Sequence, residues 1–237
     1  MNANTSKVLV RILLFLGFLL IAAVVLFALV HRDRRPRVCI AAECGDTNYL
    51  AQYLASGGNV SDTVVRYRFE PRSAPLLHIA AWSGQLNAVD WLLQRRANPD
   101  LRDDEGYTAL LAVIGHGENE VAVQVLQRLL RAGADPNLKS SSGFWTPLIN
   151  AADLGEAKFI SELLAAGTDV HATNNQGSTA LHFASTAEVA RLLIAAGADR
   201  TISTGGVGGE TPADSAIRFA HSEALKVITN GILKTNN

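Results

Sequence analysis

The 237-residue sequence contains only two cysteines, Cys39 and Cys44, which are too few for a disulfide framework. They lie five positions apart in a segment that we expect to be helical, so their side chains point to different sides and their Cα atoms lie too far apart to bridge. Free thiols are typical of proteins in a reducing compartment. The scarcity of cysteine therefore favours a cytoplasmic location for this part of the chain.

An excess of basic residues is also lacking. The formal net charge is −1, and residues 73–237 carry 12 Lys and Arg against 17 Asp and Glu. Binding to a phosphate backbone depends on clustered Lys and Arg side chains. We therefore expect no nucleic-acid partner for the main body of the chain.

The sequence lacks any grouping of residues that is typical of catalysis or metal binding. The six histidines do not cluster, and no two of them stand at metal-ligand spacing with a cysteine or an acidic residue. Cys44 has Glu43 beside it but no nearby histidine to act as a base. The glycine-rich segment 205–211 lacks the lysine of a P-loop. We expect no metal, cofactor or small-molecule substrate, and an enzyme with an unrecognised site is the least favoured interpretation.

One long hydrophobic run stands near the start of the chain. Val8–Val30 is apolar apart from Arg11, and a helix of this length matches the roughly 30 Å hydrocarbon core of a bilayer. The run is longer than the apolar region of a secretory signal and does not end in an A-x-A-like site. We predict a short N-terminal tail at 1–7, a transmembrane helix at 8–30 and a basic juxtamembrane linker at 31–35.

The charges that flank this run predict its orientation. Lys7 and Arg11 lie at its start, and more basic residues follow it, namely Arg32, Arg34, Arg35 and Arg37. The flank richer in Lys and Arg usually stays in the cytoplasm. We therefore expect a single-pass membrane protein whose main domain, residues 36–237, faces the cytoplasm, although a short tail with two positive charges can also stay inside.

An internal repeat organises the rest of the chain. Four similar segments, Leu76–Ala81, Thr108–Val113, Thr146–Ala152 and Thr179–Ala184, are each followed by a second apolar stretch and a turn of small residues. Fainter copies open at Val38 and Thr211, and the steps between equivalent positions are 39, 33, 38, 33 and 32 residues. A period of this length indicates stacked structural units. We predict units at 36–74, 75–107, 108–145, 146–178, 179–210 and 211–237.

Local chemistry indicates that each unit is a pair of helices. Thr146 before Pro147, like Thr211 before Pro212, is typical of an N-cap followed by proline in the first helical turn. Glycines stand where the second helix would end in a left-handed turn, at Gly133, Gly167 and Gly197. A single helix pair cannot bury its apolar face, so the units must stack.

The pattern Thr-Pro-Leu-His-x-Ala, with Gly-Ala-Asp after the second helix, resembles the ankyrin-repeat family. The resemblance implies an all-α ankyrin-repeat solenoid of five to six helix-turn-helix units, preceded here by a single transmembrane helix. It also implies that the motif histidines are structural. His182 has the hydroxyl of Thr179 as its expected partner, whereas His78 faces Pro75 and loses that hydroxyl.

Four departures from the repeat locate the variable parts of the chain. The first long step places extra residues at Ser61–Ala74, either as a solvated insertion or as a basic and aromatic surface for anionic headgroups. A second insertion is divided between Glu118–Arg128 and Ser140–Trp145. The fifth unit lacks three residues, so Ser185–Glu188 must turn tightly. In the last unit Asp214 replaces the motif histidine, which suits a terminal cap.

The resemblance implies a protein-binding function that uses the concave face and the loop tips of the stack. The first-helix positions that it assigns to this surface are Glu43, Trp82, Ser83, His116, Asp153 and Leu154. The loop-tip positions are Arg102, Asp104, Glu105, Tyr107, Lys139, Phe144, Trp145, Asn174, Asn175 and Gln176. The favoured function is a membrane-anchored scaffold, adaptor or inhibitor that binds a protein partner of unknown identity. The alternative is a structural subunit of a membrane complex that packs through Val8–Val30.

Overall fold

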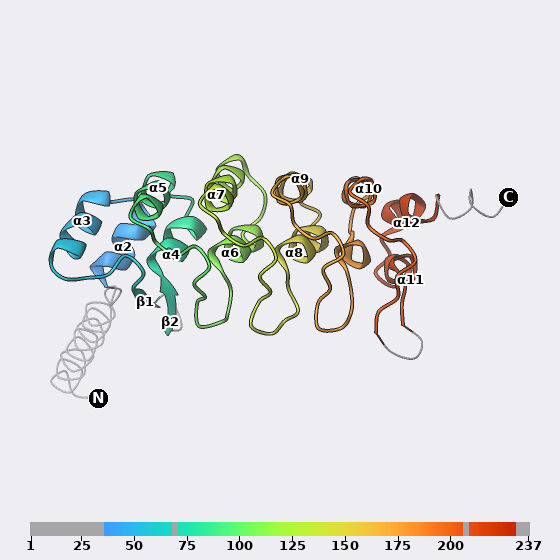
Figure 1. Ribbon diagram of the computed structural model, residues 1–237, viewed down its shortest axis with the longest axis horizontal. Helices are drawn as coiled ribbons and strands as arrows, with labels where there is room; N and C mark the ends of the chain where they lie inside the picture. The colour runs from blue at the N-terminus through green and yellow to red at the C-terminus, as the bar shows by residue number, and fades with distance from the viewer. Residues whose placement is uncertain (1–35, 68–70, 206–208, 231–237) are drawn as a thin grey trace, which may run out of the picture.

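The computed structural model describes residues 36–67, 71–205 and 209–230, and it shows an elongated stack of helical pairs (Figure 1). The first elements of the pairs form one row and the second elements form another. Each element contacts the equivalent element of the neighbouring pair. The predicted tail, transmembrane helix and linker lie outside the described residues. Within the described residues, no helix is both long enough and apolar enough to span a bilayer.

Six pairs follow one another along the chain, and one pair lies in each predicted unit. They are α2 (Arg37–Cys44) with α3 (Thr47–Ala55), α4 (Leu76–Trp82) with α5 (Leu86–Gln94), α6 (Ala109–Gly115) with α7 (Glu120–Arg131), α8 (Pro147–Leu154) with α9 (Ala157–Ala165), η1 (Ala180–Phe183) with α10 (Ala187–Ala195), and α11 (Pro212–Arg218) with α12 (Ser222–Thr229).

Threonine residues cap the first helices α6, α8 and α11. The Thr146 hydroxyl accepts a hydrogen bond from the backbone N–H of Ile149 at 3.1 Å, and Pro147 occupies the first turn of α8. In α11, the Thr211 hydroxyl accepts from the N–H of Asp214, whose carboxylate accepts from the Thr211 N–H at 2.9 Å. These bonds satisfy backbone donors that the helix leaves unpaired. The predicted caps at Thr146 and Thr211 are confirmed.

Glycines end the second helices as the sequence predicts. Gly133, Gly167 and Gly197 have φ values of 89°, 82° and 97°, in the left-handed region that glycine enters without a steric penalty. No heavy atom lies within 4 Å of a Cβ built on any of the three, so the backbone conformation rather than crowding selects glycine.

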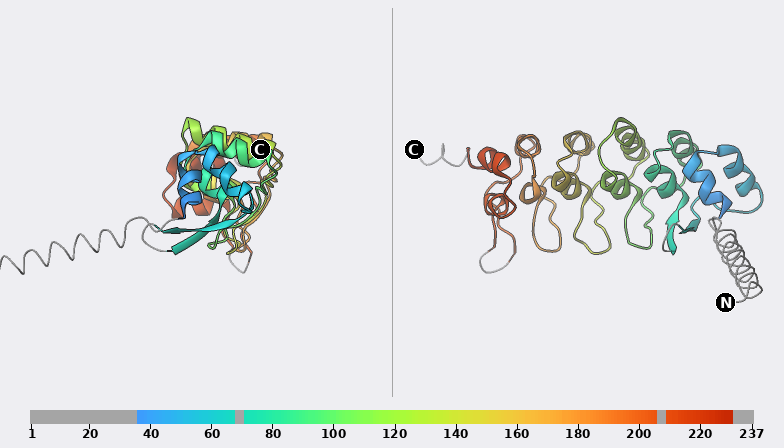
Figure 2. Two further views of the ribbon diagram at one scale, coloured as in Figure 1. Left: turned by 90° about the vertical axis from the view of Figure 1, so that its left-hand side faces the viewer. Right: turned by 180° about the vertical axis from the view of Figure 1, so that it is seen from behind.

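A β-hairpin departs from the all-α prediction. Strands β1 (Thr63–Tyr67) and β2 (Pro71–Pro75) pair antiparallel within the inserted segment, with buried Val64 opposite buried Ala74. The backbone of Ser73 is bonded to the next loop, because its N–H donates to the Asp104 carboxylate at 2.8 Å and its carbonyl accepts from the Asp104 N–H at 3.0 Å. The hairpin therefore projects on the same side of the stack as the loops (Figure 2).

The fifth unit is shortened in its first element, where a 3-10 helix, η1, replaces the α-helix. Ser185 donates both its backbone N–H (3.2 Å) and its hydroxyl (3.1 Å) to the carbonyl of Ala152 in the preceding unit. Thr186 then caps α10 through the N–H of Val189 at 3.2 Å. Because this unit lacks three residues, its first element is a single helical turn, and the predicted tight turn follows it directly.

The hydrophobic core lies between the two rows of helices. Leucine, isoleucine and phenylalanine side chains of the second helices, such as Leu126 and Phe159, are fully buried against the first helices. Alanine pairs such as Ala151–Ala152 are also fully buried, and their small side chains let neighbouring first helices approach closely. This continuous packing fixes how the first helices present their exposed ends.

Candidate protein-binding groove

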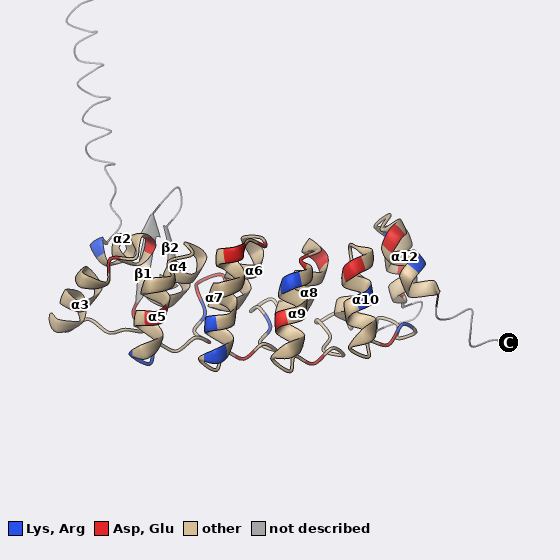
Figure 3. Ribbon diagram, turned by 90° about the horizontal axis from the view of Figure 1, so that it is seen from above, with Lys and Arg blue, Asp and Glu red and all other residues tan. Residues whose placement is uncertain are grey.

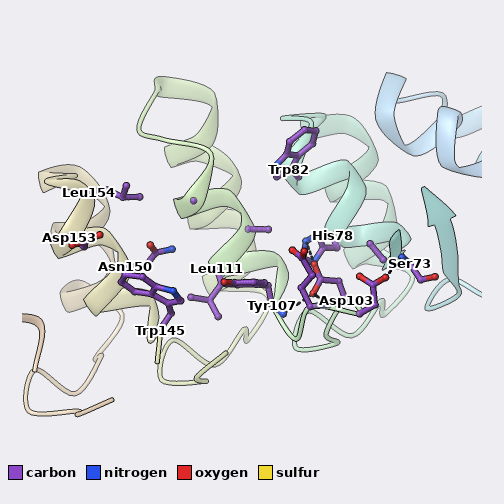
Figure 4. A pocket seen from close by; sticks show the side chains of 15 residues that line it. Ser73, His78, Trp82, Asp103, Tyr107, Leu111, Trp145, Asn150, Asp153 and Leu154 are labelled. Carbon is purple, nitrogen blue, oxygen red and sulfur yellow. Dashed lines mark hydrogen bonds and ion pairs between the residues drawn. The ribbon is translucent and has the colours of Figure 1, made fainter. Parts of the chain in front are cut away.

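A groove of about 460 Å³ crosses three helical pairs and the hairpin beside them (Figure 4). The hairpin, α4, α6, α8 and the loops that precede α6 and α8 supply its walls. Seven of the predicted surface residues lie in its lining, namely Trp82, Asp104, Glu105, Tyr107, Trp145, Asp153 and Leu154. The stack therefore brings together residues that are up to 72 positions apart in the sequence.

One end of the groove is organised around Asp103. Its Oδ2 lies 3.4 Å from Nε2 of His78, which is only 6 % exposed. Its Oδ1 accepts hydrogen bonds from the backbone N–H groups of Glu105 at 3.1 Å and Tyr107 at 2.8 Å. This carboxylate holds both a side chain of α4 and the loop before α6 in one conformation. Asp103 was not among the predicted residues, although the run of three acidic residues was visible in the sequence.

His78 has a structural role, as the sequence predicts, but with an unexpected partner. It contacts Asp103 of the next loop instead of a threonine hydroxyl, and it also lines the groove. His182 has its expected partner, because its Nδ1 lies 3.0 Å from the Thr179 hydroxyl oxygen. The backbone N–H of Thr179 donates to the same Nδ1 at 3.1 Å, so Nε2 donates to the carbonyl of Glu210 at 3.1 Å. Burial lowers the pKa of His182.

The other end of the groove holds Asp153, in the last turn of α8. Among the described residues, its carboxylate forms no hydrogen bond or ion pair. Asp153 is exposed, but the side chains around it remove part of its water and raise its pKa, and the charge of His221 opposes this shift. Leu154 beside it is 46 % exposed. This end of the groove therefore combines an exposed carboxylate that forms no hydrogen bond or ion pair among the described residues with open apolar surface.

Aromatic rings line the groove between its two ends and in the adjoining hollow. The ring of Trp82 stacks on His116 with a centroid distance of 4.9 Å, and together with Ser83 they line an adjoining hollow of about 320 Å³. Trp145 packs against the core, with its ring 4.6 Å from Phe144 and 6.0 Å from Phe183. Phe144 also lines a third hollow together with Gln176. The predicted aromatic residues thus have fixed orientations in or beside the groove.

Several predicted loop-tip residues hold neighbouring loops together. The Arg102 guanidinium donates to the carbonyls of Gly106 and Lys139, and the Asn175 amide donates to the Ser142 carbonyl at 3.1 Å. Lys139 itself is exposed at a loop tip. None of these residues lines the groove.

Two predicted surface residues lie elsewhere. Asn174 is only 3 % exposed, which contradicts its predicted place on the surface. Its side-chain oxygen Oδ1 accepts hydrogen bonds from the backbone N–H groups of Gln176 and Ser178. The side chain therefore stabilises the conformation of its own loop. Glu43 lies on α2, outside the groove, where it accepts a weak hydrogen bond from the buried thiol of Cys39.

The stacked helical pairs and the groove across them define an α-solenoid repeat protein. A family model described as ankyrin repeats (3 copies) matches residues 77–170, 119–204 and 158–237, which together exceed half of the chain. The chain therefore belongs to the ankyrin-repeat family. The repeats of this family are protein-interaction modules.

The repeat region is similar to parts of longer proteins of different kinds. An L-asparaginase from Dirofilaria immitis is 32 % identical over 147 residues, which cover 62 % of this chain and 23 % of that protein. A putative ankyrin repeat-containing protein from Treponema pallidum is 29 % identical over 165 residues, which cover 65 % of this chain and 54 % of that protein. This chain thus spans about half or less of these relatives, and the asparaginase match concerns only a part of that protein.

A solved structure has the same fold. A chain in the complex of a predatory endopeptidase from Bdellovibrio bacteriovorus with an immunity protein is similar with a TM-score of 0.66 and 24 % sequence identity. The match covers 81 % of this chain and 96 % of that chain.

Proposed function

We propose that this chain is a membrane-anchored interaction module that binds a segment of a partner protein in the concave groove. The supporting observation is the convergence of Trp82, Tyr107 and Trp145 with carboxylates in one hollow. Aromatic side chains in partly desolvated pockets supply much of the binding energy of protein interfaces. The hydrogen bonds to Asp103 hold Tyr107 before a partner arrives, which reduces the entropy that binding must overcome.

The proposed anchor is Val8–Val30, with the repeat domain on the cytoplasmic side. Its support is the length of the apolar run and the basic residues that follow it. An anchored repeat stack would hold its partner at the membrane surface. Scaffold, adaptor and inhibitor are the roles that this arrangement serves.

Photo-crosslinking in cells tests the groove. A photo-reactive amino acid replaces Leu154, which is exposed in the groove, or Trp82 in the full chain. The matched control replaces Ser161, which is exposed on α9 in the other row of helices. We expect discrete protein adducts from positions 154 and 82 and none of the same size from 161. Equal adducts from all three positions, or none from the groove, would refute the proposed function.

The anchor is tested by exchanging residues 8–30 for an unrelated apolar span and repeating the crosslinking. We expect the groove adducts to persist, because the groove makes the contacts. Their loss would favour the alternative, in which the chain packs into a membrane complex through its span. A compartment-sensitive reporter fused to the C-terminus should be active only in the cytoplasm, and activity only outside it would reverse the proposed orientation.

A further inference from the structure

The groove has a one-sided charge. Four of the described residues that line it carry carboxylates, Asp103, Asp104, Glu105 and Asp153, and none is a lysine or arginine. Several described basic residues lie on the second helices, for example Arg128 and Arg131 on α7 and Lys158 on α9 (Figure 3), while Arg102 and Lys139 lie on the loops beside the groove without lining it. Carboxylates lining a concave surface concentrate a negative potential in it. The described lining of the groove therefore favours cationic groups over acidic chains.

Two of these carboxylates are held in place by the fold. Asp104 accepts from the Ser73 N–H, and Asp103 accepts from two loop N–H groups, so neither must reorganise to receive a partner. Exposed Glu105 extends from the same loop. Carboxylates fixed in this way suit a guanidinium or an ammonium group, which gains strong hydrogen bonds from ionised oxygens.

Asp153 supplies an independent argument at the opposite end. It is exposed in the groove lining and has no hydrogen bond or ion pair among the described residues. A cationic side chain from an occupant can therefore pair with it. Between the two acidic ends lie the rings of Tyr107 and Trp145 and the side chain of Leu111, which suit apolar side chains (Figure 4).

Geometry sets the spacing of the occupant's charges. The acidic ends are about two helix-to-helix steps apart, and packed helices are about 8–10 Å apart, so the separation is roughly 15–20 Å. An extended chain rises about 3.3 Å per residue and covers this distance in about six residues.

We infer that the groove binds an extended segment of a partner protein that carries two basic residues about six positions apart with apolar residues between them. This inference rests on the proposed function and names the partner's chemistry. The loop of Asp103–Glu105 receives one basic residue, Asp153 receives the other, and the aromatic floor contacts the residues between. A guanidinium at either end can also stack on an aromatic ring.

Arrays of seven-residue peptides test the inference with the full chain, purified in detergent and fluorescently labelled. Three sets differ only at their ends, which are Arg, Gln or Glu, and share five central positions varied among Leu, Val, Phe, Thr and Ser. We expect binding to concentrate in the arginine set and to weaken as ionic strength rises. Stronger or equal binding in the other sets, or no binding in any set, would reject the basic segment.

Variants then locate the contact. For the best arginine peptide, measured by fluorescence anisotropy, Asp153→Asn and Glu105→Gln should each lower the affinity about fivefold to tenfold. The matched control Glu188→Gln removes an exposed carboxylate on α10, outside the groove, and should leave the affinity unchanged. Unchanged affinity in both groove variants would also overturn the inference. If the peptide experiments reject the basic segment but position 154 still crosslinks to a partner, the proposed function stands. If position 154 gives no partner adduct, the proposed function is refuted as well.

Discussion

His182 joins two repeats through both nitrogen atoms of its ring. Nδ1 contacts Thr179 at the start of the same 3-10 helix, and Nε2 reaches the carbonyl of Glu210 before the last pair. The first contact is buried and the second is partly buried, and a neutral ring with its proton on Nε2 makes both. The imidazole therefore ties the shortened fifth unit to the terminal one.

Stability should consequently depend on the charge of His182. Burial lowers its pKa in the folded state, while the unfolded chain binds the proton near pH 6.5. The histidine's contribution is complete above pH 6.5 and is lost as pH falls through that value toward the folded pKa. Urea unfolding between pH 7.5 and 5 should show this loss, and His182→Gln should flatten it. Exposed His116→Gln should retain the full pH dependence, and an unaltered profile in His182→Gln would contradict the assignment.

Asp153 should have the opposite effect on stability. Its raised pKa means that folding disfavours the ionised form, and a negative charge in the last turn of α8 also opposes the helix dipole. Asp153→Asn should therefore raise the melting temperature at pH 7, with the gain disappearing below about pH 4, where the unfolded carboxyl is neutral as well. Glu188→Gln, in the first turn of α10, should instead lower the melting temperature slightly. A lower melting temperature for Asp153→Asn would show that the carboxylate has a stabilising partner.

At the scale of the elements, the caps and turns are the features that the sequence predicts best. Thr146, Thr211 and Gly133 have local roles that depend only on their neighbours along the chain. The hairpin at 63–75 was missed because its strands pair with each other and with the loop at Asp104, and the repeat pattern contains no signal for such contacts. The tight turn of the fifth unit was predicted from its length, but the 3-10 geometry of η1 was not.

Loss of one cap should have a measurable and local cost. Thr146→Ala removes the acceptor for the Ile149 N–H in a buried helix start and should lower the free energy of unfolding by about 1 kcal/mol. Chemical denaturation with an unchanged m-value would measure it. Ser161→Ala, at an exposed position in the interior of α9, serves as the control and should not destabilise the protein. A neutral Thr146→Ala would contradict the capping role.

At the scale of the whole molecule, the groove is a product of stacking. The sequence indicated Trp82, Tyr107 and Trp145 individually, through their positions in the repeat. It could not indicate that Asp103 and Asn150 join them, because their proximity depends on how three units and the hairpin pack. Trp145 also contacts two phenylalanine rings, so we expect its replacement by alanine to lower the melting temperature as well as to weaken partner binding.

Gly115 offers a way to block the groove without disturbing the stack. It lies exposed in α6 within the groove lining, and a Cβ added there meets only the Asn150 amide nitrogen, at 3.9 Å. Replacing a helical glycine by arginine gains helix propensity, so the fold should be retained or slightly stabilised. The arginine side chain would occupy the groove and neutralise part of its charge.

The most direct test of the central claim is therefore photo-crosslinking from position 154 in the full chain with and without Gly115→Arg. The account expects Gly115→Arg to abolish the partner adduct while the melting temperature stays the same or rises. Ser161→Arg, which adds the same charge on α9, should leave the adduct intact. An undiminished partner adduct in a folded Gly115→Arg variant would contradict the claim that the groove is the binding surface.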